Sequence, residues 1–179
     1  MHNPKGDQSF NKIDCRTIND NFIRLIGDDW LLITAGKMEE FNTMTASWGG
    51  IGVLWNKAVA ICFIRPTRYT YMFTETNDIF TLSFFSEKER DILRYCGTKS
   101  GRDVNKIAAT GLEPFICENS GIGYSEASLI FECRKIYYDD LKATNFLLPE
   151  TDGKNYPKKD YHRMYIGEIL ASYQRKQSS

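Results

Sequence analysis

Short apolar runs separated by glycine, proline and polar turn residues dominate the first half of the chain. Residues 30–36, 57–64 and 78–85 are rich in Ile, Leu, Val and Phe, and short runs bounded by turn residues are typical of buried strands. Pro66 ends the second run because proline cannot continue a paired strand. Residues 43–55 are expected to form one further strand, interrupted by glycines that indicate a bulge or a close backbone approach.

Three short helices are expected between the strands, over residues 67–76, from Ser86 to Gly97, and over residues 104–109. Thr67 is a candidate N-cap for the first helix. Ser86 and Glu89 have the spacing of a capping box at the start of the second, and Gly97 is its candidate C-cap. Gly111 is expected to stop the third helix.

The last third of the chain returns to strand patterns. Residues 127–138 and 164–173 are expected to be strands, whereas residues 147–159 are rich in Pro, Asp, Gly and Lys and predict an exposed loop. Residues 1–20 look like a loose N-terminal arm, followed by a single domain over residues 21–179. Strands dominate and the helices are short, which favours a mainly β (β-dominated α+β) fold, an antiparallel barrel with short helices.

Composition narrows the class of protein. The 179 residues are 42% hydrophobic and carry a formal net charge of +0, which indicates a globular domain and argues against nucleic acid as a partner. No apolar run approaches the roughly 18 residues that span a membrane. The polar N-terminus lacks an apolar signal segment. We therefore expect a cytoplasmic protein without a membrane partner.

The residues that usually carry metal or nucleophilic chemistry are sparse. The five cysteines show no C-x-x-C spacing and the two histidines lie far apart, so we expect free thiols and no metal site. The segment 121–126 fails the dinucleotide fingerprint, because Glu126 replaces its last glycine. The segment 97–101 lacks P-loop spacing, and no G-x-S-x-G elbow is present. No catalytic side chain is predicted.

Three turns rich in hydroxyl groups, glycine and cations are the strongest functional signal. They lie at residues 42–50, 65–70 and 96–103, each next to an expected strand or helix. A phosphate is bound by backbone N–H groups, Ser or Thr hydroxyls and one or two cations. If the fold brings these turns together, they form a site for a phosphorylated cofactor.

Residues 42–48, 65–70, 82–86 and 96–106, in this order and spacing, resemble the flavin reductase-like family, and within it the flavoredoxin branch. The resemblance covers about residues 25–135, and residues 163–169 add a further match. It implies an FMN-binding split β-barrel that forms a homodimer, with FMN near the interface. The implied reaction is flavin reduction by NADH or NADPH, or electron transfer through bound FMN.

The resemblance also implies roles for particular residues. Those expected at the flavin edge and ribityl chain are Thr45, Ala46, Ser47 and Trp48. Those expected at the ribityl-phosphate end are Thr67, Arg68 and Thr70. The backbone of Ser83, Phe84 and Phe85 is expected to meet the pyrimidine edge, and Ser100, Gly101 and Arg102 to close over the phosphate or ribityl chain. Hydride transfer is the chemistry of the flavin itself.

Two other interpretations stay open at this point. The chain could be a flavoredoxin-type electron carrier without nicotinamide chemistry, or a pyridoxamine-phosphate oxidase type of barrel, which would need a basic cluster that the sequence does not show. Cys96 lies near the carboxyl end of an expected helix, where the helix dipole disfavours a thiolate. We expect it to be a buried or merely lining thiol rather than a redox-active one.

Overall fold

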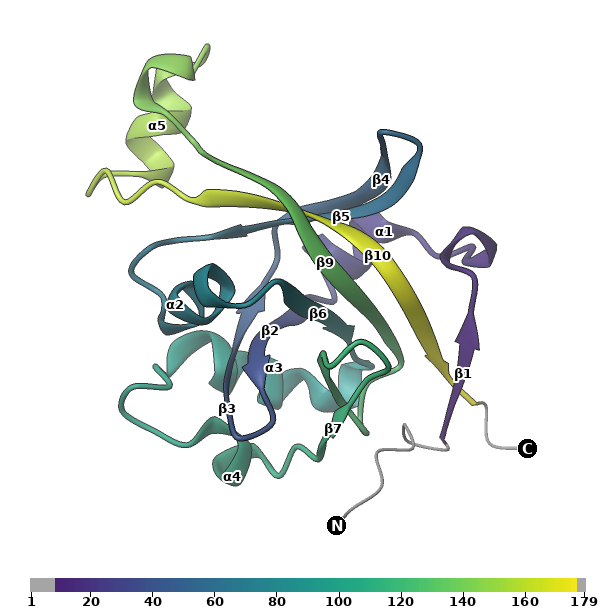
Figure 1. Ribbon diagram of the computed structural model, residues 1–179. Coiled ribbons are helices and arrows are strands. Elements are labelled where there is room, and N and C mark those ends of the chain that lie inside the picture. The colour runs from purple at the N-terminus through teal and green to yellow at the C-terminus, as the bar shows by residue number, and fades with distance from the viewer. Residues whose placement is uncertain (1–8, 177–179) are drawn as a thin grey trace.

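The computed structural model describes residues 9–176 and centres on one strongly curved antiparallel sheet (Figure 1). Seven strands follow the order β3-β2-β6-β9-β10-β5-β4, and β1 adds to β10. The strands are β1 (Phe10–Ile13), β2 (Leu31–Lys37), β3 (Glu40–Ala46), β4 (Gly49–Leu54), β5 (Lys57–Ile64), β6 (Ile79–Phe84), β9 (Leu129–Asp140) and β10 (Arg163–Arg175). A separate hairpin joins β7 (Pro114–Ile116) to β8 (Ile122–Tyr124).

The part of the chain that the structure describes contains five short α-helices: α1 (Phe22–Gly27), α2 (Tyr69–Thr76), α3 (Arg90–Thr98), α4 (Lys106–Thr110) and α5 (Pro149–Asn155). Three single turns of 3-10 helix are η1 (Cys15–Thr17), η2 (Glu87–Glu89) and η3 (Ala143–Asn145). Figure 1 shows α2, α3 and α4 gathered around β2, β3 and β6, while α5 stands apart beyond the ends of β9 and β10. No helix within residues 9–176 is long and apolar enough to cross a membrane.

Successive side chains of a strand point to opposite faces of the sheet, and the buried ones therefore form two hydrophobic clusters. On β2, Leu31 and Ile33 face the inside of the curved sheet with Phe131, whereas Leu32 faces a second cluster with Leu93 on α3. Strand β10 bends where its pairing with β9 shifts register after Ile166. Gly167 follows that shift, and a Cβ there would lie 2.5 Å from the Phe80 ring. Only glycine leaves this approach open.

Several local expectations need correction. The segment 43–55 forms two strands, because β3 pairs with β2 and β4 pairs with β5, at opposite ends of the sheet order. Gly97 lies inside α3, which ends one residue later. A Cβ on Gly97 would lie 3.2 Å from Cβ of Thr45, so this glycine permits close packing of α3 on β3. Arg68, not Thr67, occupies the N-cap of α2.

Two segments expected to be irregular are ordered. Residues 1–8 of the expected N-terminal arm lie outside the described residues, but β1 pairs with β10 along its whole length. The expected loop 147–159 contains α5, which begins at Pro149 and has Glu150 and Asp152 in its first turn. Lys159 and Tyr161 both donate hydrogen bonds to Asp152, at 2.7 and 2.8 Å. These contacts fold the segment back on itself.

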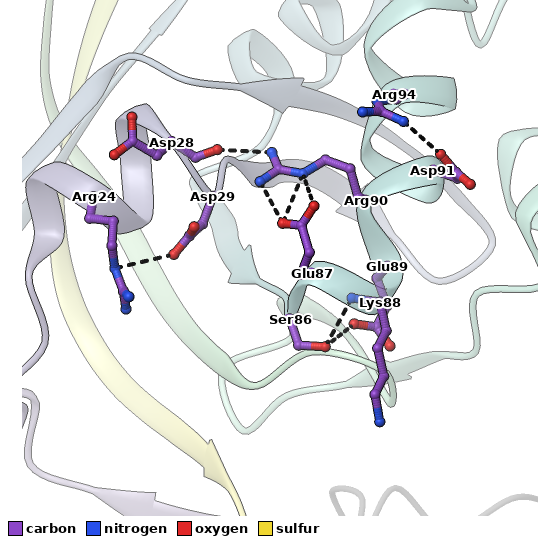
Figure 2. Close-up of polar contacts among 10 residues, drawn as sticks. All are labelled: Arg24, Asp28, Asp29, Ser86, Glu87, Lys88, Glu89, Arg90, Asp91 and Arg94. Carbon is purple, nitrogen blue, oxygen red and sulfur yellow. Dashed lines mark hydrogen bonds and ion pairs between the residues drawn. The ribbon is translucent and has the colours of Figure 1, made fainter.

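Figure 2 shows how the start of α3 is fixed. The Ser86 hydroxyl accepts from the backbone N–H of Lys88 at 3.4 Å and donates to Glu89 at 2.6 Å, a variant of the expected capping box. Arg90 pairs with Glu87 and donates to the backbone oxygen of Asp28 at 2.9 Å. The start of α3 is thereby joined to the chain that enters β2.

Candidate functional site

A cleft of about 190 Å³ opens where β3 ends and α2 begins. We call it the β3–α2 cleft. It is lined by Met44, Thr45, Ala46, Ser47, Trp48, Phe63, Arg65, Arg68 and His162. Three distant parts of the sequence therefore meet here: the end of β3, the link from β5 to α2, and the residue that precedes β10.

The end of β3 supplies backbone donors to this cleft. Pairing with β2 stops at Ala46, opposite Leu31. No residue described by the structure accepts a hydrogen bond from the backbone N–H of Ser47 or Trp48. The Thr45 hydroxyl, in contrast, already donates to the backbone oxygen of Leu93 at 2.5 Å. Ser47 and Trp48 are thus the residues of this segment that are open to a ligand.

The start of α2 is a second source of donors. Arg68 occupies the N-cap of the helix, and its side chain makes no capping hydrogen bond. Within residues 9–176, the backbone N–H groups of Tyr69 and Thr70 have no acceptor. Exposed N–H groups and the helix dipole make such a helix start attractive to anions. The Thr70 hydroxyl accepts from Asn42 Nδ2 at 2.7 Å and is fully buried, so this side chain fixes α2 to β3.

Three guanidinium groups surround this helix start. Arg68 donates to the backbone oxygen of Gly97 at 3.0 Å, at the carboxyl end of α3. Arg102 donates to the backbone oxygen of Thr67 at 3.2 Å and lies over the Tyr69 ring. Neither pairs with a carboxylate in the described part of the chain. Arg65 differs, because Asp160 accepts from it at 2.7 Å.

His162 closes the far side of the cleft against Trp48. Their ring centroids are 5.1 Å apart. His162 Nδ1 lies 2.8 Å from the Tyr156 hydroxyl, and Arg65 stacks on the same tyrosine ring. Burial, with help from the nearby charge of Arg65, lowers the pKa of His162 to about 4. The imidazole is therefore neutral at pH 7.

The residues predicted from the sequence are divided between this cleft, an adjoining cavity and the interior. Thr45, Ala46, Ser47, Trp48 and Arg68 line the cleft. Thr67 is exposed and does not line the cleft. Gly101 and Arg102 line an adjoining cavity on the other side of the α2 start, and the Ser100 hydroxyl accepts from the backbone N–H of Arg102 at 3.2 Å.

The predicted residues on β6 lie elsewhere. Ser83 is fully buried and paired on both sides, with Leu32 of β2 and Ile130 of β9. Phe84 packs on Phe131, and Phe85, which follows the strand, lies in the cluster beneath α3. None of these three predicted residues lines the β3–α2 cleft. Strands on both sides of β6 keep its backbone from the cleft.

Sequence reasoning assigned no role to four of the lining residues, which are Met44, Phe63, Arg65 and His162. Arg65 lies in one of the three turns noted in the sequence, but no binding role was predicted for it. His162 has no recognisable motif around it, because it follows the long segment that connects β9 to β10. Cys96 is buried as expected, and burial raises the pKa of its thiol to about 11. Among the described residues, no group of His, Cys, Asp and Glu is arranged to hold a metal ion.

The donor set of the cleft suits a phosphorylated aromatic group. Arg68 and the start of α2 provide positive charge and N–H donors for a phosphate. Ser47 and the Trp48 backbone offer hydrogen bonds, and the rings of Trp48 and His162 offer flat surfaces. The residues present therefore fit a flavin nucleotide.

Comparison with known proteins gives the family. The model of the flavin reductase-like domain matches residues 24–179. The chain belongs to the flavin reductase-like domain family. No curated protein sequence matches it significantly.

Solved structures confirm the fold at low sequence identity. Flavoredoxin from Methanosarcina acetivorans is 23% identical with a TM-score of 0.65, covering 83% of this chain and 69% of that one. An FMN-binding domain of a flavin reductase-like enzyme from Shewanella baltica is 16% identical with a TM-score of 0.68, covering 95% and 79%. An NADH:FAD oxidoreductase from Streptomyces globisporus is 15% identical with a TM-score of 0.63, covering 87% and 84%. The predicted split β-barrel is confirmed.

The lowered pKa of His162 predicts a pH-dependent stability. Between pH 6.5 and about 4 the unfolded chain binds a proton at this residue and the folded chain does not. The free energy of unfolding should therefore fall as the pH is lowered through this window, by up to about 3 kcal/mol. Urea unfolding at pH 7 and pH 4.5 measures the loss. His162→Asn should show a smaller loss, and equal losses in the two proteins would contradict the assignment.

Proposed function

We propose that this chain binds FMN in the β3–α2 cleft and acts as an NAD(P)H-dependent flavin oxidoreductase. One observation carries the proposal: Arg68, the N-cap residue of α2, lines the same cleft as the open segment Ser47-Trp48. A phosphate and a flat polar ring would thus find complementary groups within one site. Membership of the flavin reductase-like family supports an oxidoreductase with a flavin as its redox group.

The chain's own residues hold and orient the cofactor. Arg68 and the N–H groups at the start of α2 would bind the phosphate, and Ser47 and Trp48 would bind the ribityl chain and ring edge. Bound flavin supplies the chemistry, accepting hydride and passing electrons onward. His162 is neutral and its Nδ1 faces the Tyr156 hydroxyl. Its ring therefore provides a flat, uncharged surface beside Trp48.

Arg68→Ala tests the phosphate end. Loss of a charged hydrogen-bond donor should weaken FMN binding by about 10- to 100-fold. Quenching of flavin fluorescence measures the dissociation constant. Arg94→Ala is the matched control, because Arg94 lies on α3 and pairs only with Asp91. Equal FMN affinity in the wild type and Arg68→Ala would remove Arg68 from the site.

An electron carrier of flavoredoxin type is the alternative, favoured by the fold-level likeness to the Methanosarcina protein. Anaerobic titration of the FMN-loaded protein with NADH and then NADPH separates the two functions. We expect the flavin absorbance to bleach rapidly with at least one nucleotide. Bleaching by dithionite alone would contradict the reductase and favour the carrier.

We also propose that the chain forms a homodimer through an exposed apolar surface. Val53, Trp55 and Tyr137 are 75%, 60% and 43% exposed, and the rings of Trp55 and Tyr137 are in contact. These residues lie around the β4–β5 hairpin, which projects from the sheet (Figure 1). Large clustered apolar side chains of this kind mark interaction surfaces.

Sedimentation equilibrium tests the dimer. Trp55→Ser should raise the dimer dissociation constant by about tenfold or more, because buried tryptophans dominate interface energies. Ile23→Ser, at a residue of α1 that is 87% exposed, should leave the dimer dissociation constant unchanged. A monomeric wild type, or equal effects of the two substitutions, would contradict this interface.

A further inference from the structure

Side chains from β9 and β10 hold the carboxyl end of α2. Lys135 of β9 donates from Nζ to the backbone oxygens of Thr74 and Glu75, at 2.6 and 3.1 Å. The Glu75 carboxylate accepts from the hydroxyl of buried Tyr165 at 2.6 Å and from Arg163 at 2.8 Å, and both donors belong to β10. We call Lys135, Arg163 and Tyr165 the α2 clamp.

The face of α2 that meets the α2 clamp is fixed at two successive turns. Tyr71 lies one turn before Glu75, and the guanidinium of Arg163 lies 5.5 Å from the centre of the Tyr71 ring. Arg163 also donates to both carboxylate oxygens of Asp140, at 2.7 and 2.8 Å. A bidentate pair of this kind defines the orientation of the guanidinium. The clamp therefore presents a fixed surface to α2.

Lys135 supplies positive charge where α2 has none of its own. The last carbonyl groups of a helix have no partner within the helix, and they form the negative end of its dipole. The last four residues of α2 are Phe, Thr, Glu and Thr, without a basic side chain. The ammonium group of Lys135 therefore satisfies two carbonyls at this end and also offsets its negative charge.

Arg68 lies at the other end of α2. It occupies the N-cap and lines the β3–α2 cleft, where the phosphate is proposed to bind. Lys135 does not line this cleft, and a helix of eight residues is about 12 Å long at 1.5 Å per residue. Lys135 therefore makes no contact with a phosphate bound at Arg68, and α2 connects the two positions.

We propose that Lys135 is a positioning residue for the phosphate of bound FMN. This inference rests on the proposed function, because the phosphate must bind at Arg68. By holding the last carbonyls of α2 against β9, the ammonium group keeps the start of the helix in place at the cleft. Arg68 is then held between α2 and the backbone oxygen of Gly97, to which it donates at 3.0 Å. A flavin without a phosphate does not need this alignment.

Two flavins that differ only in the phosphate test this inference. Riboflavin has the ring and ribityl chain of FMN but no phosphate. Lys135→Met keeps a long apolar side chain and removes the ammonium group. It should weaken FMN binding by about tenfold, a change of the size expected when one charged hydrogen bond is lost, and leave riboflavin binding within about twofold. Quenching of flavin fluorescence measures the dissociation constants.

Rescue and coupling separate positioning from a general loss of structure. Lys135→Arg should restore FMN affinity to within about threefold, because a guanidinium can donate to the same carbonyls. Residues that act through one contact show coupled effects, whereas independent effects add. In the Arg68→Ala background, Lys135→Met should therefore change FMN affinity by less than about twofold.

Tyr165→Phe keeps the test valid if Lys135→Met does not fold. It removes only the hydroxyl that donates to Glu75, and it should weaken FMN with a smaller effect and the same dependence on Arg68. Lys142→Met is the matched control, because Lys142 follows β9 and pairs with Asp139 rather than with α2. It removes one positive charge and should leave both flavins within about twofold.

The outcomes distinguish this inference from the proposed function. Equal losses of FMN and riboflavin in Lys135→Met, or equal losses in the wild-type and Arg68→Ala backgrounds, would overturn the inference and leave the proposed function intact. Unchanged FMN affinity in a folded Lys135→Met protein would do the same. A wild-type protein that binds no FMN would overturn the proposed function itself.

Discussion

The hydrogen bond from Asn42 Nδ2 to the Thr70 hydroxyl is the contact on which the functional region depends. It is 2.7 Å long, both residues are buried, and it joins β3 to the first turn of α2. An unpaired polar group at either position would be costly in this interior. Because the bond fixes where α2 begins, it places Arg68 at the β3–α2 cleft.

The start of α2 carries an excess of positive charge that the chain as a whole does not have. The formal net charge is +0, yet Arg65, Arg68 and Arg102 gather at the start of α2. Arg68 is held by the carboxyl end of α3, and Arg65 is neutralised by Asp160. The excess positive charge is therefore local and faces an opening of defined shape. Such an arrangement favours a small anion, here a nucleotide phosphate.

Much of the fold follows from the sequence pattern, since strongly apolar runs bounded by turn residues have few alternatives. Strand β5 occupies the expected residues 57–64. The elements that the pattern missed are stabilised by pairing with distant strands. Only half of the residues of β1 are apolar, and β1 is ordered because it pairs with β10. Gly97 looked like a helix end, but it serves the close contact between α3 and Thr45.

The candidate site could be predicted only in its local parts. The turns at residues 45–48 and 65–68 carry hydroxyl groups and cations in sequence, so their chemistry is visible before their position. His162 reaches the cleft only because β10 pairs with β5 and β9 after the α5 excursion. The backbone of Ser83 was expected at the pyrimidine edge, but no sequence pattern reveals that β2 and β9 pair with this residue on both sides.

A crystal structure of the FMN-reconstituted protein tests the central claim most directly. The account predicts the phosphate within hydrogen-bond distance of Arg68 and of the backbone N–H groups that begin α2, with the ring beside Ser47 and Trp48. Flavin bound elsewhere on the chain, or a phosphate that contacts neither Arg68 nor α2, would contradict it.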